Sequence, residues 1–313
     1  MKKVSRAVVF AHYDKDFIVD DYVLYYLKEL RTVCDYLVFV SCNELAQGEE
    51  QKLNGLADCI IAEKHSEYDF GSYKRGYFFL KNNEKFKEFD ELLFVNDSCF
   101  GPLYPLVRVF EKMENTNADF WGITRNYYGI KIDNGTMKSC PRPHIQSYFI
   151  VFKRVVFESE IFEKFMENIC AQEDKGRIIE KYEIGLSETL ERYGFKSDEF
   201  VKFLYGLDNP MLKMWRFMVL FGRLPFLKCG LLRLANKNLT TCYRWKKIVQ
   251  DNFEYPVEII ETNLKRTMRS KLNPKTTFGY VKVCWFSFLQ FLPRKLRVFL
   301  IKFTSKFLKF MID

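Results

Sequence analysis

The sequence lacks the features that mark several large protein classes. The longest nearly apolar stretch in its 313 residues is 283–292, well short of the ~20 residues that a membrane-spanning helix needs. The apolar run 7–11 is too short for a signal peptide and is followed at once by Asp14 and Asp16. No internal repeat or low-complexity segment is present. We therefore expect a globular chain with neither a secretory leader nor a spanning helix.

Metal-binding and disulfide patterns are also missing. The nine cysteines are odd in number, no two form a C-x-x-C pair, and none lies near one of the three histidines at zinc-finger spacing. We interpret them as free, mostly buried thiols of a protein in a reducing cytosol. The G-x-x-x-x-G-K-S/T loop of the P-loop nucleotidases is absent as well.

What the sequence does contain is apolar and unevenly charged. Hydrophobic residues make up 48% and aromatic residues 17%, enough for a sizeable core. Residues 1–200 hold 27 basic and 34 acidic side chains, a net −7, whereas residues 201–313 hold 22 and 6, a net +16. The basic part suggests an anionic surface, either membrane or nucleic acid. Nucleic acid is disfavoured because the basic residues alternate with Phe, Leu and Trp, and no helix-turn-helix or zinc signature is visible.

Apolar runs and helical patterns alternate along the first 200 residues. Short apolar runs predict buried strands at 5–11, 36–41, 59–62, 92–95, 119–124 and 147–152. Amphipathic spacing predicts helices at about 21–30, 69–82, 105–114, 158–170 and 184–193, and residues 132–135 resemble a hairpin turn. This order predicts an α/β fold with a mostly parallel sheet and helices on both faces.

The strand at 92–95 is the centre of the pattern, because it ends abruptly at Asn96, Asp97 and Ser98. In open α/β sheets, ligands bind beyond the carboxyl ends of the strands. A carboxylate at that position can hold a divalent cation, and the cation can hold a diphosphate. The alternative is that Asn-Asp-Ser is only a turn and a helix cap.

Two further segments offer groups for a nucleotide. His12, Tyr13 and Asp14 follow the first strand, where Tyr13 can stack on a base and Asp14 can accept from the base or the ribose. The alternative is a loop with a helix cap.

Residues 69–76 form the second segment, at a helix start. Asp69, Gly71, Ser72, Lys74 and Arg75 put a flexible backbone, a hydroxyl and two cations there, and such groups can bind phosphate. The alternative is an ordinary N-cap with a solvated basic turn.

The acceptor and the base have candidates further along. His144, Gln146 and Ser147 stand just before a strand, where His144 can contact an acceptor sugar, although a lone histidine is more often structural. Glu183 stands near the start of a helix and can act as a general base for an acceptor hydroxyl. Its alternative role is to stabilise that helix N-terminus.

Taken in order, these segments make the chain similar to the rhamnan synthesis F family of glycosyltransferases, over roughly residues 4–265. The matching pieces are residues 11–14, 69–74, 93–102, 118–122, 144–149, 183–187, 209–210 and 224–228. Each piece is weak alone, whereas the ordered set is specific.

The resemblance implies an A-type glycosyltransferase fold, a Rossmann-like sheet that binds a nucleotide sugar, with dTDP-rhamnose as the expected donor. It places Asn96 and Ser98 with the nucleotide sugar and Trp121 with the acceptor. Asn-Asp-Ser takes the place of the family's Asp-x-Asp metal motif, so Asp97 is the only carboxylate there for Mg²⁺ or Mn²⁺. Transfer to a growing cell-surface polysaccharide or a lipid-linked glycan by single displacement would invert the anomeric centre. The alternative function is a non-catalytic, membrane-associated protein that binds a nucleotide sugar or glycan.

We expect three parts: a catalytic domain at 1–200, a helical acceptor-side extension at 201–280, and a basic amphipathic tail at 281–313. A tail helix would place apolar side chains on one face and lysines on the other. The apolar face would hold Leu296, Phe299, Leu300, Phe303, Phe307 and Phe310, and the other face Lys295, Lys302, Lys306 and Lys309. We therefore predict a cytoplasmic protein held peripherally on the inner, anionic face of the cell membrane. The alternative is that the helix packs on the catalytic domain.

Overall fold

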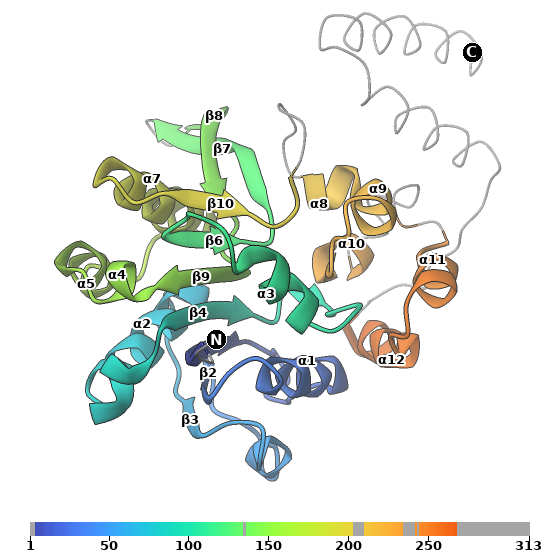
Figure 1. Cartoon of the computed structure of the whole chain (residues 1–313). Helices are drawn as coiled ribbons and strands as arrows, with labels where there is room; N and C mark the ends of the chain where they lie inside the picture. Colours follow the sequence, from blue (N-terminus) through green and yellow to red (C-terminus); the bar gives the residue numbers. More distant parts are fainter. Residues whose placement is uncertain (1–3, 134–135, 203–209, 234–241, 243, 268–313) are drawn as a thin grey trace, which may run out of the picture.

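The structure is a computed structural model that describes residues 4–133, 136–202, 210–233, 242 and 244–267 (Figure 1). A seven-stranded sheet lies at its centre in the order β10-β6-β9-β4-β1-β2-β3. Every neighbouring pair is parallel except the two pairs that β9 makes, with β4 and with β6. The strands are β1 (Arg6–His12), β2 (Tyr36–Ser41), β3 (Cys59–Ala62), β4 (Glu91–Asn96), β6 (Phe120–Gly122), β9 (Phe149–Lys153) and β10 (Ser197–Glu199). The predicted α/β fold with a mostly parallel sheet is confirmed.

The sheet is buried on both faces, which explains why its central strands read as unbroken apolar runs. Alternate residues of one strand enter different cores, as the side-chain period of two requires. Leu93 and Val95 of β4 join one core, and Leu92 and Phe94 join the other. The result is a three-layer arrangement of helix, sheet and helix.

Each helical layer completes one of these cores. The first core receives α1 (Asp21–Arg31) and α3 (Val107–Met113). The second receives α2 (Tyr68–Lys81), α4 (Arg154–Phe157), α5 (Glu160–Glu167) and α7 (Gly185–Arg192). The short α6 (Lys175–Ile178) and a π-helix at Ile179–Ile184 lead into α7. The predicted helices therefore exist, although the one expected at 158–170 is shorter, as α5, and the short α4 before it was not predicted.

The C-terminal helices share the first core with the sheet rather than forming a separate one. Residues of α9 (Trp215–Leu220), α10 (Cys229–Arg233), α11 (Trp245–Asn252) and α12 (Val257–Thr267) are buried in it, and α12 packs against α1. The element α8 (Pro210–Lys213) precedes them. No helix in the part of the chain that the structure describes is long and apolar enough to cross a membrane. The predicted tail at 281–313 lies outside the described residues.

Two antiparallel pairs stand apart from the main sheet. The hairpin of β7 (Arg125–Asp133) and β8 (Thr136–Ile145) brackets residues 134–135, so the predicted turn is confirmed. The second pair joins β5 (Cys99–Phe100) to β11 (Leu227–Lys228), which are distant in the sequence. We call this pair the β5–β11 ribbon.

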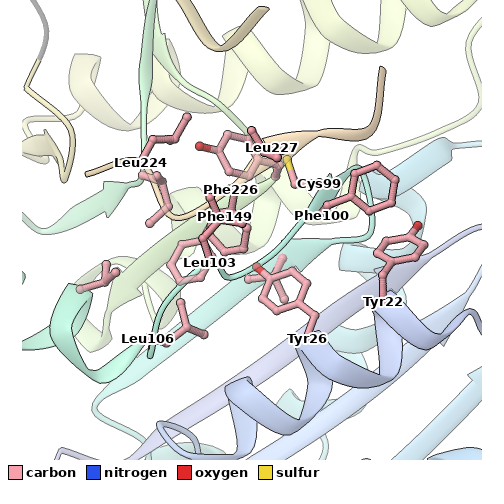
Figure 2. Close-up of a cluster of buried hydrophobic side chains, with 14 of the residues drawn as sticks. Tyr22, Tyr26, Cys99, Phe100, Leu103, Leu106, Phe149, Leu224, Phe226 and Leu227 are labelled. Carbon is pink, nitrogen blue, oxygen red and sulfur yellow. The ribbon is translucent and has the colours of Figure 1, made fainter. Parts of the chain in front are cut away.

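Aromatic side chains pack the β5–β11 ribbon against α1 (Figure 2). The ring centroids of Tyr22 and Phe100 lie 4.9 Å apart, and those of Tyr26 and Phe226 lie 5.2 Å apart. A Cβ atom at Gly101 would lie 2.6 Å from the Pro225 carbonyl oxygen, so the close approach of the two chain segments requires glycine there. The aromatic contacts fix the position of the residues that flank the ribbon.

Candidate active site

The polar residues that end β4 are organised by hydrogen bonds. The Asn96 Nδ2 donates to Asp69 Oδ2 at 2.6 Å, and the Ser98 backbone N–H and hydroxyl both donate to Asn96 Oδ1. The Tyr13 backbone N–H donates to Asp97 Oδ2 at 2.9 Å. The Tyr22 hydroxyl donates to the Asp97 carbonyl oxygen at 3.0 Å. The site predicted at the end of this strand is therefore a fixed constellation that joins β1, α1, α2 and β4.

The Asp97 carboxyl is an unusually weak acid for an aspartate. Burial raises its pKa to about 7, and the charges of Asp69 and Asp14 act in the same direction. The Tyr13 N–H and the positive charge of Arg233 oppose this increase without cancelling it. The usual pKa of an aspartate is about 3.9. The raised pKa therefore shows that the negative charge of Asp97 is poorly compensated in the folded protein. A bound cation would supply that compensation.

Asp97 interacts with a second carboxyl, that of Asp69, and Asp69 interacts with a third, Glu183, which stands on an irregular helix. Burial and the charge of Glu183 raise the pKa of Asp69, which shows that these two carboxyls interact. Glu183 belongs to the π-helix Ile179–Ile184, and its Oε1 accepts from the Ser147 backbone N–H at 3.1 Å. Short π-helical segments occur frequently at functional sites. Glu183 therefore lies where the sequence predicts the start of an α-helix, but its backbone is π-helical.

Two cations complete the site, and the sequence analysis assigned a role to neither. The Lys228 Nζ donates to Ser98 Oγ at 3.1 Å and lies 4.7 Å from the centroid of the Tyr148 ring. The Arg233 Nη2 donates to the Tyr22 hydroxyl at 3.3 Å, and its charge acts on Asp97. Lys228 belongs to segment 224–228, which carries part of the family resemblance, so a signal was present in the sequence.

The three residues predicted to bind the nucleotide near the end of β1 have different environments in the structure. Tyr13 is 56% exposed and free to stack on a base. The Asp14 carboxylate is paired with the Arg266 guanidinium at 2.5 Å. His12 is 3% exposed, its Nδ1 lies 3.2 Å from Ser41 Oγ, and burial lowers its pKa to about 4. Direct contact of His12 with a nucleotide is thus contradicted, because the neutral ring is enclosed.

The predicted phosphate cations Lys74 and Arg75 point away from the end of β4. The Lys74 Nζ donates to the carbonyl oxygens of Glu167 and Ile169, and Arg75 pairs with Glu63. Both cations lie in the body of α2, so the helix N-terminus does not present them.

Gly71 and Ser72 are buried in the same helix. A Cβ at Gly71 would meet His65 Nδ1 at 2.7 Å, and Ser72 Oγ lies 3.0 Å from His65 Nε2. Of the residues predicted in the 69–76 segment, Asp69 reaches the site, through its contact with Asn96.

Of the predicted acceptor residues, Trp121 is misplaced. Its indole is 1% exposed and packs against Phe110 and Phe149, so it is a core residue and cannot contact an acceptor. The apolar strand that holds it explains the error, because its side chain faces the first core rather than the sheet edge.

The other three acceptor candidates lie beside Glu183 or the β7–β8 hairpin. Ser147 donates its backbone N–H to Glu183, and the Gln146 Oε1 accepts from the Thr124 hydroxyl. The His144 Nδ1–H donates to the Arg142 carbonyl oxygen at 2.8 Å, and the ring is as enclosed as that of His12. All three side chains are largely buried in the absence of a ligand.

The site fits a divalent cation only if a ligand supplies part of its coordination. Within the described residues, no three or more His, Cys, Asp or Glu side chains are grouped so that they could hold a metal ion. Asp97 offers carboxylate oxygen, and Mg²⁺ is commonly held by one or two carboxylates together with substrate phosphates. A cation at Asp97 would therefore be shared with a diphosphate.

The fold and the site together define a class. A mostly parallel sheet with one antiparallel strand, and a cluster of polar side chains at the carboxyl ends of its strands, make this an open α/β fold of the kind that binds ligands at that edge. The chain belongs to the rhamnan synthesis protein F family, whose sequence profile matches residues 37–309. The family expected from the sequence is confirmed.

Curated relatives match about half of the chain. Protein y4gN of Sinorhizobium fredii, which is uncharacterized, is 26% identical over 159 residues, covering 51% of this chain and 39% of that protein. Virulence protein VirA of Vibrio anguillarum is 28% identical over 164 residues, covering 52% of this chain and 48% of that protein. The matched part thus spans less than half the length of these relatives.

Solved structures with a similar backbone trace share little sequence identity with this chain. A 4-diphosphocytidyl-2C-methyl-D-erythritol synthase is 12% identical with a TM-score of 0.39, covering 65% of this chain and 94% of that one. Core-mannan synthase A from Aspergillus fumigatus, in a Mn/GDP form, is 11% identical with a TM-score of 0.38, covering 64% and 73%. At TM-scores this low, neither likeness supports a statement about substrate or mechanism.

Proposed function

We propose that this protein is a glycosyltransferase that moves a sugar from a nucleotide sugar to a growing cell-surface polysaccharide or lipid-linked glycan. One observation carries the proposal: three interacting carboxyls, Asp97, Asp69 and Glu183, meet the cation Lys228 at the carboxyl edge of the sheet. These groups come from four separate chain segments. A structural role alone does not require such a concentration of partly buried charge, which is costly without a ligand.

The departing nucleoside diphosphate would be stabilised by the cations of the site. Lys228 gives one of its three N–H donors to Ser98, which leaves donors for phosphate oxygens. Arg233 adds positive charge close to Asp97. A divalent cation, when bound at Asp97, would act as a Lewis acid on the same diphosphate. Fixed cations directed at a developing negative charge are an effective source of rate enhancement.

Glu183 would remove the proton from the acceptor hydroxyl. As this oxygen attacks the anomeric carbon, the bond to the diphosphate breaks and the configuration inverts. The Ser147 N–H holds the carboxylate in position through Oε1, which leaves Oε2 for the acceptor proton. The proposed donor is dTDP-rhamnose, with Tyr13 stacked on the base.

The proposal is tested by a panel of nucleotide sugars. We expect one donor to raise the midpoint of thermal unfolding, because binding to the folded state alone stabilises it. The same donor should be hydrolysed slowly without an acceptor and used for transfer with one. Binding without hydrolysis or transfer would instead identify a non-catalytic binding protein.

Lys228 and Lys74 provide a matched pair of substitutions for the phosphate site. We expect Lys228→Gln to weaken binding of the nucleoside diphosphate about tenfold, since one charge-assisted hydrogen bond to a phosphate is lost. Lys74→Gln should lower thermal stability, because Lys74 anchors two carbonyl oxygens, and leave nucleotide affinity unchanged. Calorimetric titration with the diphosphate measures both variants. Equal losses of affinity would contradict the assignment of Lys228.

The C-terminal tail is proposed to hold the enzyme on the cytoplasmic face of the membrane, near a lipid-linked acceptor. The support is the sequence pattern of apolar and lysine faces within residues 293–311. Each lysine near an anionic surface contributes about 1 kcal/mol. We expect truncation after Leu292 to release the protein from anionic vesicles while nucleotide binding persists. Cosedimentation of the truncated chain, or none by the full chain, would exclude the tail as the anchor.

A further inference from the structure

A second cavity lies beyond the β5–β11 ribbon and is separate from the carboxylate site. Its volume is about 1040 Å³, and it opens between α3, the segment that precedes β11, and the residues that follow α11. The lining includes Tyr104, Arg108, Lys112, Arg223 and Phe253. Neither the sequence analysis nor the proposed transfer step uses any of these side chains.

Three cations line this cavity together with two carboxylates, so that the lining keeps an excess of one positive charge (+3 and −2). Within the described part of the chain, neither Arg108 nor Arg223 forms an ion pair, while Glu111 and Glu254 also line the cavity. Burial and the charge of Arg223 lower the pKa of Lys112, which shows that these two cations repel each other. Like charges gathered at a concave surface are unfavourable unless an anion binds between them.

The backbone fixes Arg223 at this position. Its φ of 56° lies in the left-handed region, which non-glycine residues seldom adopt. The Tyr104 hydroxyl donates to the Arg223 carbonyl oxygen, so this conformation also positions the aromatic wall. The rings of Tyr104 and Phe253 are stacked with centroids 6.3 Å apart. The cavity thus combines exposed guanidinium groups, one of them on a fixed backbone, with a flat apolar wall.

The β5–β11 ribbon connects this cavity to the carboxylate site. Near one end, Lys228 contacts Ser98, and at the other the Leu103 N–H donates to the Pro225 carbonyl oxygen at 2.7 Å. Arg223 and Tyr104 lie just beyond that second contact. A ligand that bridges the two sites would follow a few residues of extended chain, on the order of 15 Å.

We propose that this cavity binds the phosphate-bearing end of the acceptor, a sugar phosphate or sugar diphosphate, with the guanidinium groups on phosphate and the aromatic wall against the sugar. The proposal rests on the proposed transferase function and adds the chemical class of its acceptor. Arginine suits this role because its planar fork forms paired hydrogen bonds with phosphate oxygens. An aromatic wall with a few convergent polar groups is the usual composition of a small-ligand site.

The test uses the full chain with glucose 1-phosphate and inorganic pyrophosphate as probes. We expect Arg108→Gln combined with Arg223→Gln to weaken binding of both probes tenfold or more, measured by calorimetry. The control, Arg192→Gln combined with Lys131→Gln, removes two exposed charges elsewhere and should bind as the unmodified chain does. Circular dichroism and the unfolding midpoint establish that each variant is folded. If the double variant is unstable, the Arg108→Gln change alone is expected to give a partial loss.

The outcomes separate this inference from the function on which it rests. Loss of probe binding in the double variant, without loss in the control or in Lys228→Gln, supports the cavity site even if no nucleotide sugar is hydrolysed by the unmodified chain. That combination would overturn the transferase proposal and leave a phosphate-binding cavity. Unchanged probe affinity in the folded double variant, or binding to phosphatidylglycerol vesicles with no binding of either soluble probe, would overturn the cavity proposal.

Discussion

Asp97→Asn is expected to abolish sugar transfer and, at the same time, to make the protein more stable above pH 7. The asparagine keeps the size of the side chain and still accepts the Tyr13 N–H, so the fold is preserved. What it loses is the negative charge that would bind a cation or orient a diphosphate. Transfer with the identified donor and denaturant unfolding at several pH values measure the two effects.

The sign of the stability change follows from the pKa of Asp97. Because burial raises it to about 7 in the folded protein, compared with about 3.9 in an unfolded chain, the folded state binds the proton more tightly. Stability is therefore lost as pH rises from about 4 through 7 and stays low above that range. We expect Asp97→Asn to remove this loss, with a gain of about 4 kcal/mol at pH 8 and almost none below pH 4.

Asp119→Asn provides the matched control. The Asp119 carboxylate also accepts a backbone N–H, from Lys196 at 2.8 Å, but it precedes β6 at the amino edge of the sheet. This variant should keep its activity. Full transfer activity in Asp97→Asn would remove Asp97 from the mechanism. A loss of stability at pH 8 would contradict the account of its buried charge.

Glu183→Gln is expected to lower turnover by a factor on the order of 10² or more, the usual contribution of a general base. Donor binding should remain nearly unchanged, because the amide oxygen still accepts the Ser147 N–H and the π-helix keeps its shape. Rapid-quench measurement of a single turnover separates the chemical step from binding.

Glu188→Gln is the comparison for that substitution. Glu188 lies on the adjoining α7 and pairs with Arg142, so its loss should reduce stability slightly and leave turnover near that of the unmodified chain. If Glu183→Gln instead loses donor affinity while turnover survives, Glu183 belongs to the donor pocket. The base would then have to be sought among the other carboxyls of the site, beginning with Asp69.

Local pattern was enough to predict most of the elements and part of the site. Buried strands appear as unbroken apolar runs because helices cover both faces of this sheet, so β1, β2, β3 and β4 were recognisable. The abrupt change from Val95 to Asn96 and Asp97 identified a strand end. Since parallel strands place their carboxyl ends at one edge, the prediction that Asp97 lies at the ligand-binding edge required no three-dimensional information.

Side-chain direction within those elements was not accessible in the same way. His12 and Trp121 have the right chemistry and belong to strands of the sheet, yet the structure encloses both side chains. Lys74 and Arg75 lie near a helix start in the sequence, but the helical rotation turns them toward Glu167 and Glu63. Neighbouring residues of a strand face opposite sides of the sheet, so a shift of one position decides whether a side chain enters the core.

The sequence by itself determined the α/β alternation, the polar end of β4 and the family to which the chain belongs. Only the tertiary structure decided which cations serve the site, because Lys228 reaches Ser98 through a strand pair that joins residues 130 positions apart. It also decided that Glu183 stands on a π-helix beside Ser147. Local periodicity depends only on neighbouring residues. The electrostatic environment of a carboxyl depends on packing between residues that are far apart in the sequence.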